Sequence, residues 1–102
     1  MKKPLDRFLS YVAFDTQSQP GQEQVPSTPN QFQLAKALCK ELSSIGAQNV
    51  ELTDHCHVYA TLPANREGIP AVGFIAHMDT SPAISGKNIK PRVVENYDGG
   101  DI

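Results

Sequence analysis

The amino-acid sequence predicts an α/β fold in which two helices accompany a mixed β-sheet. Two stretches repeat apolar residues at the helical period, and two later stretches place β-branched and aromatic residues between turn formers. A third candidate strand, "IPAVGFIAHM" at 69–78, is apolar almost throughout, which is typical of a strand covered on both faces. We therefore expect this strand to be buried near the centre of the sheet.

Size and charge narrow the possible functions. The 102 residues are 39% hydrophobic and 20% charged, the proportions of one soluble globular domain. A net charge of -2 disfavours nucleic-acid binding, which depends on clustered lysine and arginine. No run is long enough to cross a membrane, and no signal-peptide core follows Lys2 and Lys3. We therefore expect a cytoplasmic protein in which the widely spaced Cys39 and Cys56 are reduced thiols.

The first helix is expected to run from Pro4 to about Asp15. Pro4 suits the first helical turn, because the N–H that proline lacks has no partner there. The segment "DTQSQPGQEQVPS" that follows is rich in turn formers and is expected to be a loop. One apolar stripe at the helical period comprises Leu5, Phe8, Leu9 and Val12.

The second helix has start and stop signals. Thr28 is a candidate N-cap, Pro29 suits the first helical position, and Gln31 can reach back to the cap. Gly46 is expected to end the helix in a left-handed conformation. The buried side is predicted to comprise Phe32, Ala35, Leu38, Leu42 and Ile45.

The rest of the chain is predicted to form strands, turns and a loop. "NVELTD" and "HVYATLP" indicate two strands at 49–54 and 57–63, joined by a turn. "NREG" at 65–68 indicates a second turn, and residues 80–91 are expected to be a loop. "RVVENY" at 92–97 is a short strand or an extended edge.

The strongest candidate site is "GFIAHMDTSP", where the apolar strand ends. His77 and Asp79 are two residues apart, so on a strand both side chains point to the same side. Ligands of open α/β sheets bind at the carboxyl ends of strands. A neutral imidazole is a good zinc ligand, and such a histidine commonly donates its other N–H to a carboxylate. His77 is thus a candidate metal ligand, and Asp79 is a candidate for the carboxylate that orients its ring. Spacing alone favours the alternative, a strand end and turn cap without a ligand, because His-x-Asp is a short pattern with many chance matches.

A rival group of donors occurs in "DHCH", from Asp54 to His57. Neighbouring strand residues point to opposite faces, so only His55 and His57 could share a metal. We interpret this segment as a polar turn, with weak adventitious metal binding as the alternative. The sequence has no phosphate-binding loop, dinucleotide fingerprint or nucleophile elbow.

Several blocks, taken in order, are similar to one enzyme family. They include "RFLSYVAFDTQS", "VPSTPNQ", "YATLPAN", "GFIAHMDTSP", "SGKNIKP" and "VVENYDGGDI". Along essentially its whole length, the chain resembles the N-terminal portion of tripeptide aminopeptidases in the M20 family of zinc metallopeptidases. The resemblance implies that His77 binds one zinc of a two-zinc centre and that Asp79 is an active-site residue that orients it. It also implies hydrolysis of the first peptide bond of tripeptides by metal-activated water, with a glutamate as general base.

The same resemblance implies how the domains are divided. Residues 1–102 are expected to be the N-terminal portion of the catalytic, zinc-binding domain. The bridging aspartate, the glutamate base, the other zinc ligands and an inserted smaller domain would lie outside them. Small peptides are the expected partners, and we expect no binding to a nucleic acid or a membrane. Two alternatives stay open: a truncated, inactive fragment with open strand edges, and a related dipeptidase or deacylase.

Overall fold

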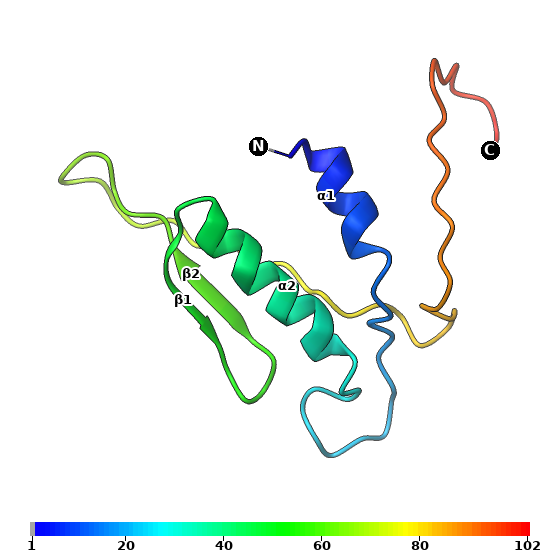
Figure 1. Ribbon diagram of the computed structural model, residues 1–102, viewed down its shortest axis with the longest axis horizontal. Coiled ribbons are helices and arrows are strands. Elements are labelled where there is room, and N and C mark those ends of the chain that lie inside the picture. Colours follow the sequence, from blue (N-terminus) through cyan, green and yellow to red (C-terminus); the bar gives the residue numbers. More distant parts are fainter. Residues whose placement is uncertain (1) are drawn as a thin grey trace.

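Two helices and a β-hairpin make up the regular secondary structure of the described residues. The structure, a computed structural model, describes residues 2–102 (Figure 1). Its elements follow the order α1 (Pro4–Tyr11), α2 (Gln31–Ser44), β1 (Gln48–Leu52) and β2 (Val58–Thr61). The two strands are antiparallel and α2 packs on them, so the coarser prediction of helices beside a sheet is confirmed. In the part of the chain described, no helix combines the length and apolarity that crossing a bilayer requires.

Helix α1 is shorter than predicted. It begins at Pro4 as expected, and the Asp6 carboxylate accepts a hydrogen bond from the Lys3 backbone N–H at 3.2 Å. A carboxylate in the first turn also interacts favourably with the helix dipole. The helix ends at Tyr11, because the next residues form a turn in which the Phe14 N–H donates to the Tyr11 carbonyl.

The predicted stop of α2 is confirmed, whereas its predicted cap is wrong. The N-cap is Asn30 rather than Thr28, and it makes no side-chain cap hydrogen bond. The Gln31 side chain donates to Thr28 Oγ1 at 3.0 Å, although the helix itself begins only at Gln31. The turn before it is tighter than an α-helix, since the Gln31 N–H donates to the carbonyl of Thr28, three residues back. Gly46 ends the helix with a φ of 91°, and the Ala47 N–H donates to the Leu42 carbonyl at 3.0 Å.

The core is small and lies between α2 and the hairpin. Its buried apolar residues are Leu34, Ala35 and Cys56. Ala35 belongs to the predicted buried stripe, whereas Ile45 of that stripe is exposed and Leu34 lay outside it. The radius of gyration is 16.6 Å, compared with about 13 Å for a compact domain of this length. The chain is therefore less compact than a self-contained domain.

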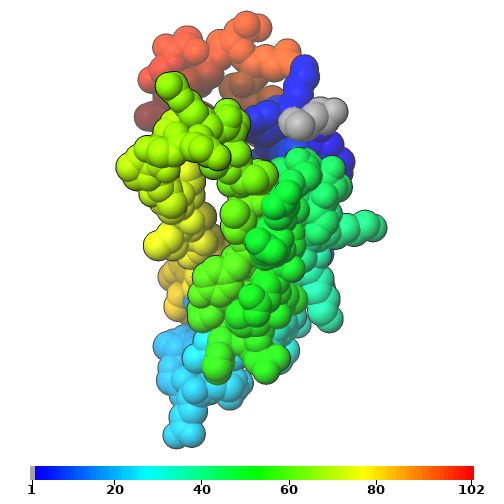
Figure 2. Space-filling model, turned by 90° about the vertical axis from the view of Figure 1, so that its left-hand side faces the viewer, coloured from blue at the N-terminus to red at the C-terminus, as the bar shows by residue number. Residues whose placement is uncertain are grey.

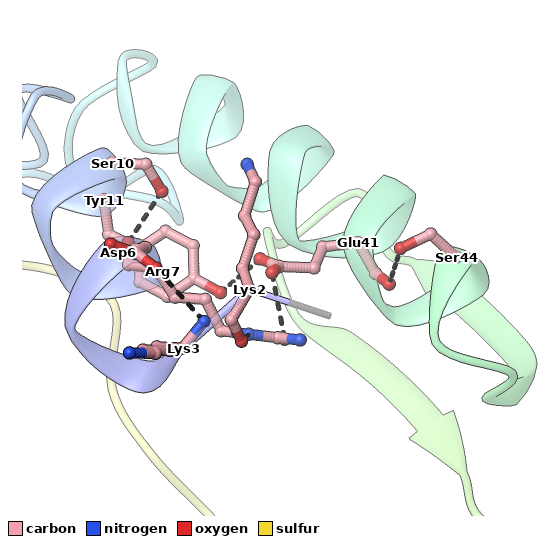
Figure 3. Close-up of polar contacts among 8 residues, drawn as sticks. All are labelled: Lys2, Lys3, Asp6, Arg7, Ser10, Tyr11, Glu41 and Ser44. Carbon is pink, nitrogen blue, oxygen red and sulfur yellow. Dashed lines mark hydrogen bonds and ion pairs between the residues drawn. The ribbon is translucent and has the colours of Figure 1, made fainter.

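A polar cluster joins α1 to α2 (Figure 3). Arg7 Nη1 lies 2.9 Å from Glu41 Oε1, and the Tyr11 hydroxyl donates a hydrogen bond to Glu41 Oε2. Both charged side chains are only about a fifth exposed, so solvent screens this ion pair less than a fully exposed one. Burial, followed by the hydrogen bond to the Glu41 carboxylate and its negative charge, raises the pKa of the Tyr11 hydroxyl.

The predicted buried strand at 69–78 is wrong for this structure. The segment is extended, but among the described residues its backbone forms no hydrogen bond. Phe74 and Ile75 are 94% and 101% exposed, so neither face of the segment is covered. An extended chain becomes a strand only where a neighbour completes the ladder of hydrogen bonds. The predicted mixed sheet is accordingly replaced by a two-stranded antiparallel one, and residues 92–97 are likewise not a strand.

Candidate metal centre

His77 and Asp79 contact each other at the end of the extended segment. His77 Nδ1 lies 2.8 Å from the backbone carbonyl oxygen of Asp79 and 3.2 Å from Asp79 Oδ1. A carbonyl oxygen only accepts hydrogen bonds, so Nδ1 carries the proton and donates it. In the neutral ring, Nε2 then has a free lone pair. The His77 side chain is 85% exposed, which leaves this nitrogen accessible to a ligand.

The backbone next to Asp79 is held by the loop that follows α1. The Thr80 N–H donates to the Thr16 carbonyl at 3.0 Å, and the Thr80 carbonyl accepts from the Ser18 N–H at 2.9 Å. These bonds form an isolated parallel bridge between Gln17 and Thr80. We call this contact of Thr16, Gln17 and Ser18 with Thr80 the clasp. Because Thr80 directly follows Asp79, the clasp fixes the position of the histidine–aspartate pair.

Side chains and one close approach reinforce the clasp. The Ser18 hydroxyl donates to the Thr80 carbonyl at 2.9 Å. Thr16 is buried, with 2% of its surface exposed. Gly86 lies so near that a Cβ atom added to it would be 2.6 Å from Asp15 Oδ1. Sequence reasoning missed all of these contacts, since the stretch from Asp15 shows only turn formers and no periodic pattern.

The rival histidines lie on the same cavity as His77. This cavity, about 550 Å³ in volume, is lined by the turn at 55–57 and by residues 74–79. The ring centroids of His55 and His57 are 6.5 Å apart. Burial, followed by the nearby Cys39, raises the pKa of the Cys56 thiol and keeps it protonated. A protonated thiol is a poor metal ligand, so Cys56 does not strengthen this group of donors.

The residues present fit part of a zinc site. Within residues 2–102, no three histidine, cysteine, aspartate or glutamate side chains come together closely enough to hold a metal ion. Zinc in proteins is held by three or four protein ligands. In such a site, His77 would be one ligand and Asp79 the carboxylate that orients it. The other donors of a complete centre would have to come from outside these residues.

The geometry of His77 and Asp79 is compatible with a metal-binding histidine. The Nε2 atom of His77 is accessible while Nδ1 contacts Asp79, and a histidine that binds a metal can have this arrangement. Comparison with known proteins is more specific. Over 103 residues the chain is 60% identical to peptidase T of Edwardsiella ictaluri (strain 93-146) and 57% identical to peptidase T of Pectobacterium carotovorum subsp. carotovorum (strain PC1). Over 98 residues it is 55% identical to peptidase T of Shewanella pealeana.

The chain is thus homologous to peptidase T over essentially all of its length. The alignments include 100%, 100% and 96% of the chain, but only 25%, 25% and 24% of the Edwardsiella, Pectobacterium and Shewanella proteins. The chain spans about a quarter of the length of the curated relatives it matches, and it corresponds to their N-terminal portion. No protein-family model matches it.

Proposed function

We propose that residues 1–102 form the N-terminal portion of the catalytic domain of a zinc-dependent tripeptide aminopeptidase. Such an enzyme releases the N-terminal residue of tripeptides in the cytoplasm. The identity of 55–60% to three peptidase T proteins supports the reaction class. The rest of the catalytic domain and the inserted smaller domain belong to the remainder of a protein as long as these relatives.

The observation that carries the residue roles is the contact of His77 Nδ1 with Asp79. This contact supports the role of a zinc ligand for His77, because it leaves the Nε2 atom free to bind. Asp79 fixes the tautomer and the ring orientation, and its negative charge makes the imidazole a stronger donor. Bound zinc supplies Lewis acidity, which activates water for attack on a peptide carbonyl. The clasp holds the backbone at Thr80, directly after Asp79, and so fixes the position of the pair.

The same structure favours a second candidate for the chain by itself, an inactive fragment. The described residues bring together no group of three metal donors. A site with one histidine gains little from preorganisation, so we expect the isolated chain to bind zinc with a dissociation constant of about 1 μM or weaker. Titration calorimetry checks this. Tight binding of one zinc per chain would show that His55 or His57 contributes more than we propose.

The catalytic roles are tested in a chimera. In it, this chain replaces the aligned 103 residues of the Edwardsiella ictaluri peptidase T. His77→Ala should lose one zinc ion and nearly all tripeptide hydrolysis. Asp79→Asn should retain most of the zinc and lose about 10- to 100-fold in rate, the usual effect of removing a partner of a metal-bound histidine.

The matched control in the same chimera is His57→Ala. It removes another exposed imidazole on the same cavity, and it should leave both zinc content and rate near those of the parent. Zinc content is measured by metal analysis, and the rate by release of the N-terminal residue. Wild-type turnover in the His77→Ala chimera would falsify the proposed role of this histidine.

A further inference from the structure

Asp98 is the one aspartate of the chain that is followed by glycine. The other five precede arginine, threonine, histidine or isoleucine, and no asparagine precedes a glycine. The position matters because the peptide nitrogen that follows an aspartate can attack the carboxyl group of that aspartate's own side chain. A side chain on the following residue hinders this attack, and glycine has no Cβ atom to do so. Asp98 is therefore the aspartate whose sequence context most favours the reaction.

The turn around Asp98 leaves both reacting groups accessible. Residues 91–102 are all exposed, and Figure 2 shows the end of the chain, in orange to red, on the surface at one end of the molecule. Asp98 Oδ1 accepts a hydrogen bond from the Gly100 N–H at 3.1 Å, so the carboxyl group is turned toward the backbone that follows it. Within residues 2–102, the Gly99 N–H donates no hydrogen bond, so its nitrogen is free to react.

The backbone of this turn can change its conformation at little cost. Two glycines follow Asp98, and glycine adopts backbone angles that other residues rarely reach. Gly99 has a φ of 92°, and a Cβ atom built on it would meet nothing within 4 Å. The hydrogen bonds that shape the turn are local, since the second one joins the Tyr97 hydroxyl to the Gly100 carbonyl. Opening the turn therefore breaks only hydrogen bonds between near neighbours.

We propose that Asp98 is a site of spontaneous isomerisation to isoaspartate. In the first step the Gly99 nitrogen forms a bond to Cγ of the Asp98 carboxylic acid, and the hydroxyl group of the acid leaves with the N–H proton as water. The product is a cyclic succinimide. In the second step one water molecule opens the ring. Attack at Cγ restores aspartate, whereas attack at the backbone carbonyl carbon of Asp98 breaks its bond to the Gly99 nitrogen and leaves the chain linked through the side chain.

The product differs from the parent in shape but not in mass. Isoaspartate adds one carbon atom to the backbone and moves the free carboxylate to the Cα atom of residue 98. The carboxylate that accepts from the Gly100 N–H is then lost from its place, and the turn is reshaped. The new carboxylate is exposed, so it is accessible to carboxyl methyltransferases that recognise isoaspartyl residues. The proposal does not rest on the proposed function, because it needs neither zinc nor the rest of a longer protein.

Peptide mapping of the chain after prolonged incubation at neutral pH tests the proposal. Trypsin releases residues 93–102 as one peptide, because Arg92 is the last basic residue. This peptide should separate into two species of equal mass, and an isoaspartyl methyltransferase with S-adenosylmethionine should methylate only the new one. Fragmentation in the mass spectrometer should locate isoaspartate at Asp98 and not at Asp101, an equally exposed residue that precedes a β-branched isoleucine. Isoaspartate at neither position, or equally at both, overturns the proposal.

Substitution of Asp98 tests the chemistry of the ring. Asp98→Glu keeps the charge, but its longer side chain cannot close the five-membered ring, so the second peptide species and the methylation should both be lost. Asp101→Glu is the matched control and should leave both at the level of the parent chain. Methylation of Asp98→Glu at that level contradicts the proposed route. The chimera contains the same turn within a longer protein and should also form isoaspartate at this position; a chimera that forms none overturns the proposal, whatever its activity.

Discussion

Gly86 offers a sharp test of the packing that supports the clasp, because this position has no room for a side chain. A Cβ atom at Gly86 would lie 2.6 Å from Asp15 Oδ1 and 3.4 Å from Thr80 Oγ1. The second distance needs a shift of only a few tenths of an ångström, so the contact with Asp15 dominates. That carboxylate oxygen accepts a hydrogen bond from the Gln17 N–H at 3.2 Å. In Gly86→Ala, Asp15 must rotate away and give up this bond.

The loss is about 0.5–1.5 kcal/mol, the net value of one ordinary hydrogen bond in a protein. In a chain of this size, each kcal/mol of lost stability lowers the melting temperature by roughly 4–8 °C. Replacing glycine by alanine also restricts the unfolded chain, which by itself stabilises a protein by about 0.4–1 kcal/mol. A control glycine substitution is needed to separate this gain from the loss of the hydrogen bond. Gly73→Ala is the control, because a Cβ atom there meets nothing within 4 Å.

The assay is urea unfolding, monitored by circular dichroism. Gly86→Ala should be about 1 kcal/mol less stable than Gly73→Ala. In an Asp15→Ala background this difference should disappear, because the clashing oxygen and its hydrogen bond are already gone. The close approach of Gly86 to Asp15 is refuted if Gly86→Ala is as stable as Gly73→Ala, or if the difference persists without the Asp15 carboxylate.

Three further predictions concern the helices and the core. The raised pKa of Tyr11 means that the folded state favours the neutral hydroxyl. This contribution to stability is fully present below about pH 10 and is lost as the pH rises through the folded-state pKa. In urea unfolding measured across this pH range, Tyr11→Phe should remove the loss. The raised pKa and burial of Cys56 should make its alkylation by iodoacetamide at pH 8 slower in the native chain than in urea, and equal rates contradict this. Leu34→Ala should cost about 2–5 kcal/mol, whereas Leu62→Ala, at a 76% exposed position, should change stability by about 0.5 kcal/mol at most.

Local signals in the sequence predicted the local structure. The Thr28–Gln31 contact and the Gly46 stop depend on residues within a few positions of each other, and the structure has both. The hairpin was predicted for the same reason, since alternation and turn formers specify it without help from distant residues. The end of α1 was missed because no helix-stop glycine marks Tyr11.

Features that depend on distant residues were predicted less well. The apolar run at 69–78 has the composition of a buried strand, but burial requires partners that composition does not supply, and Phe74 and Ile75 remain exposed. The contact between His77 and Asp79 follows from their spacing. The clasp beside them joins residues far apart in the sequence, so no local pattern predicted it.

The clasp also has a consequence for the order of folding. Ser18 and Thr80 are separated by 62 residues, whereas the helices and hairpin are built from contacts between nearer neighbours. Closing so long a loop costs conformational entropy before any bond repays it, so contacts of this kind form late. During synthesis, the ribosome completes α1, α2 and the hairpin before Thr80 exists. The nascent chain therefore acquires its helical scaffold first, and the histidine–aspartate pair is set in place only when translation has passed the clasp.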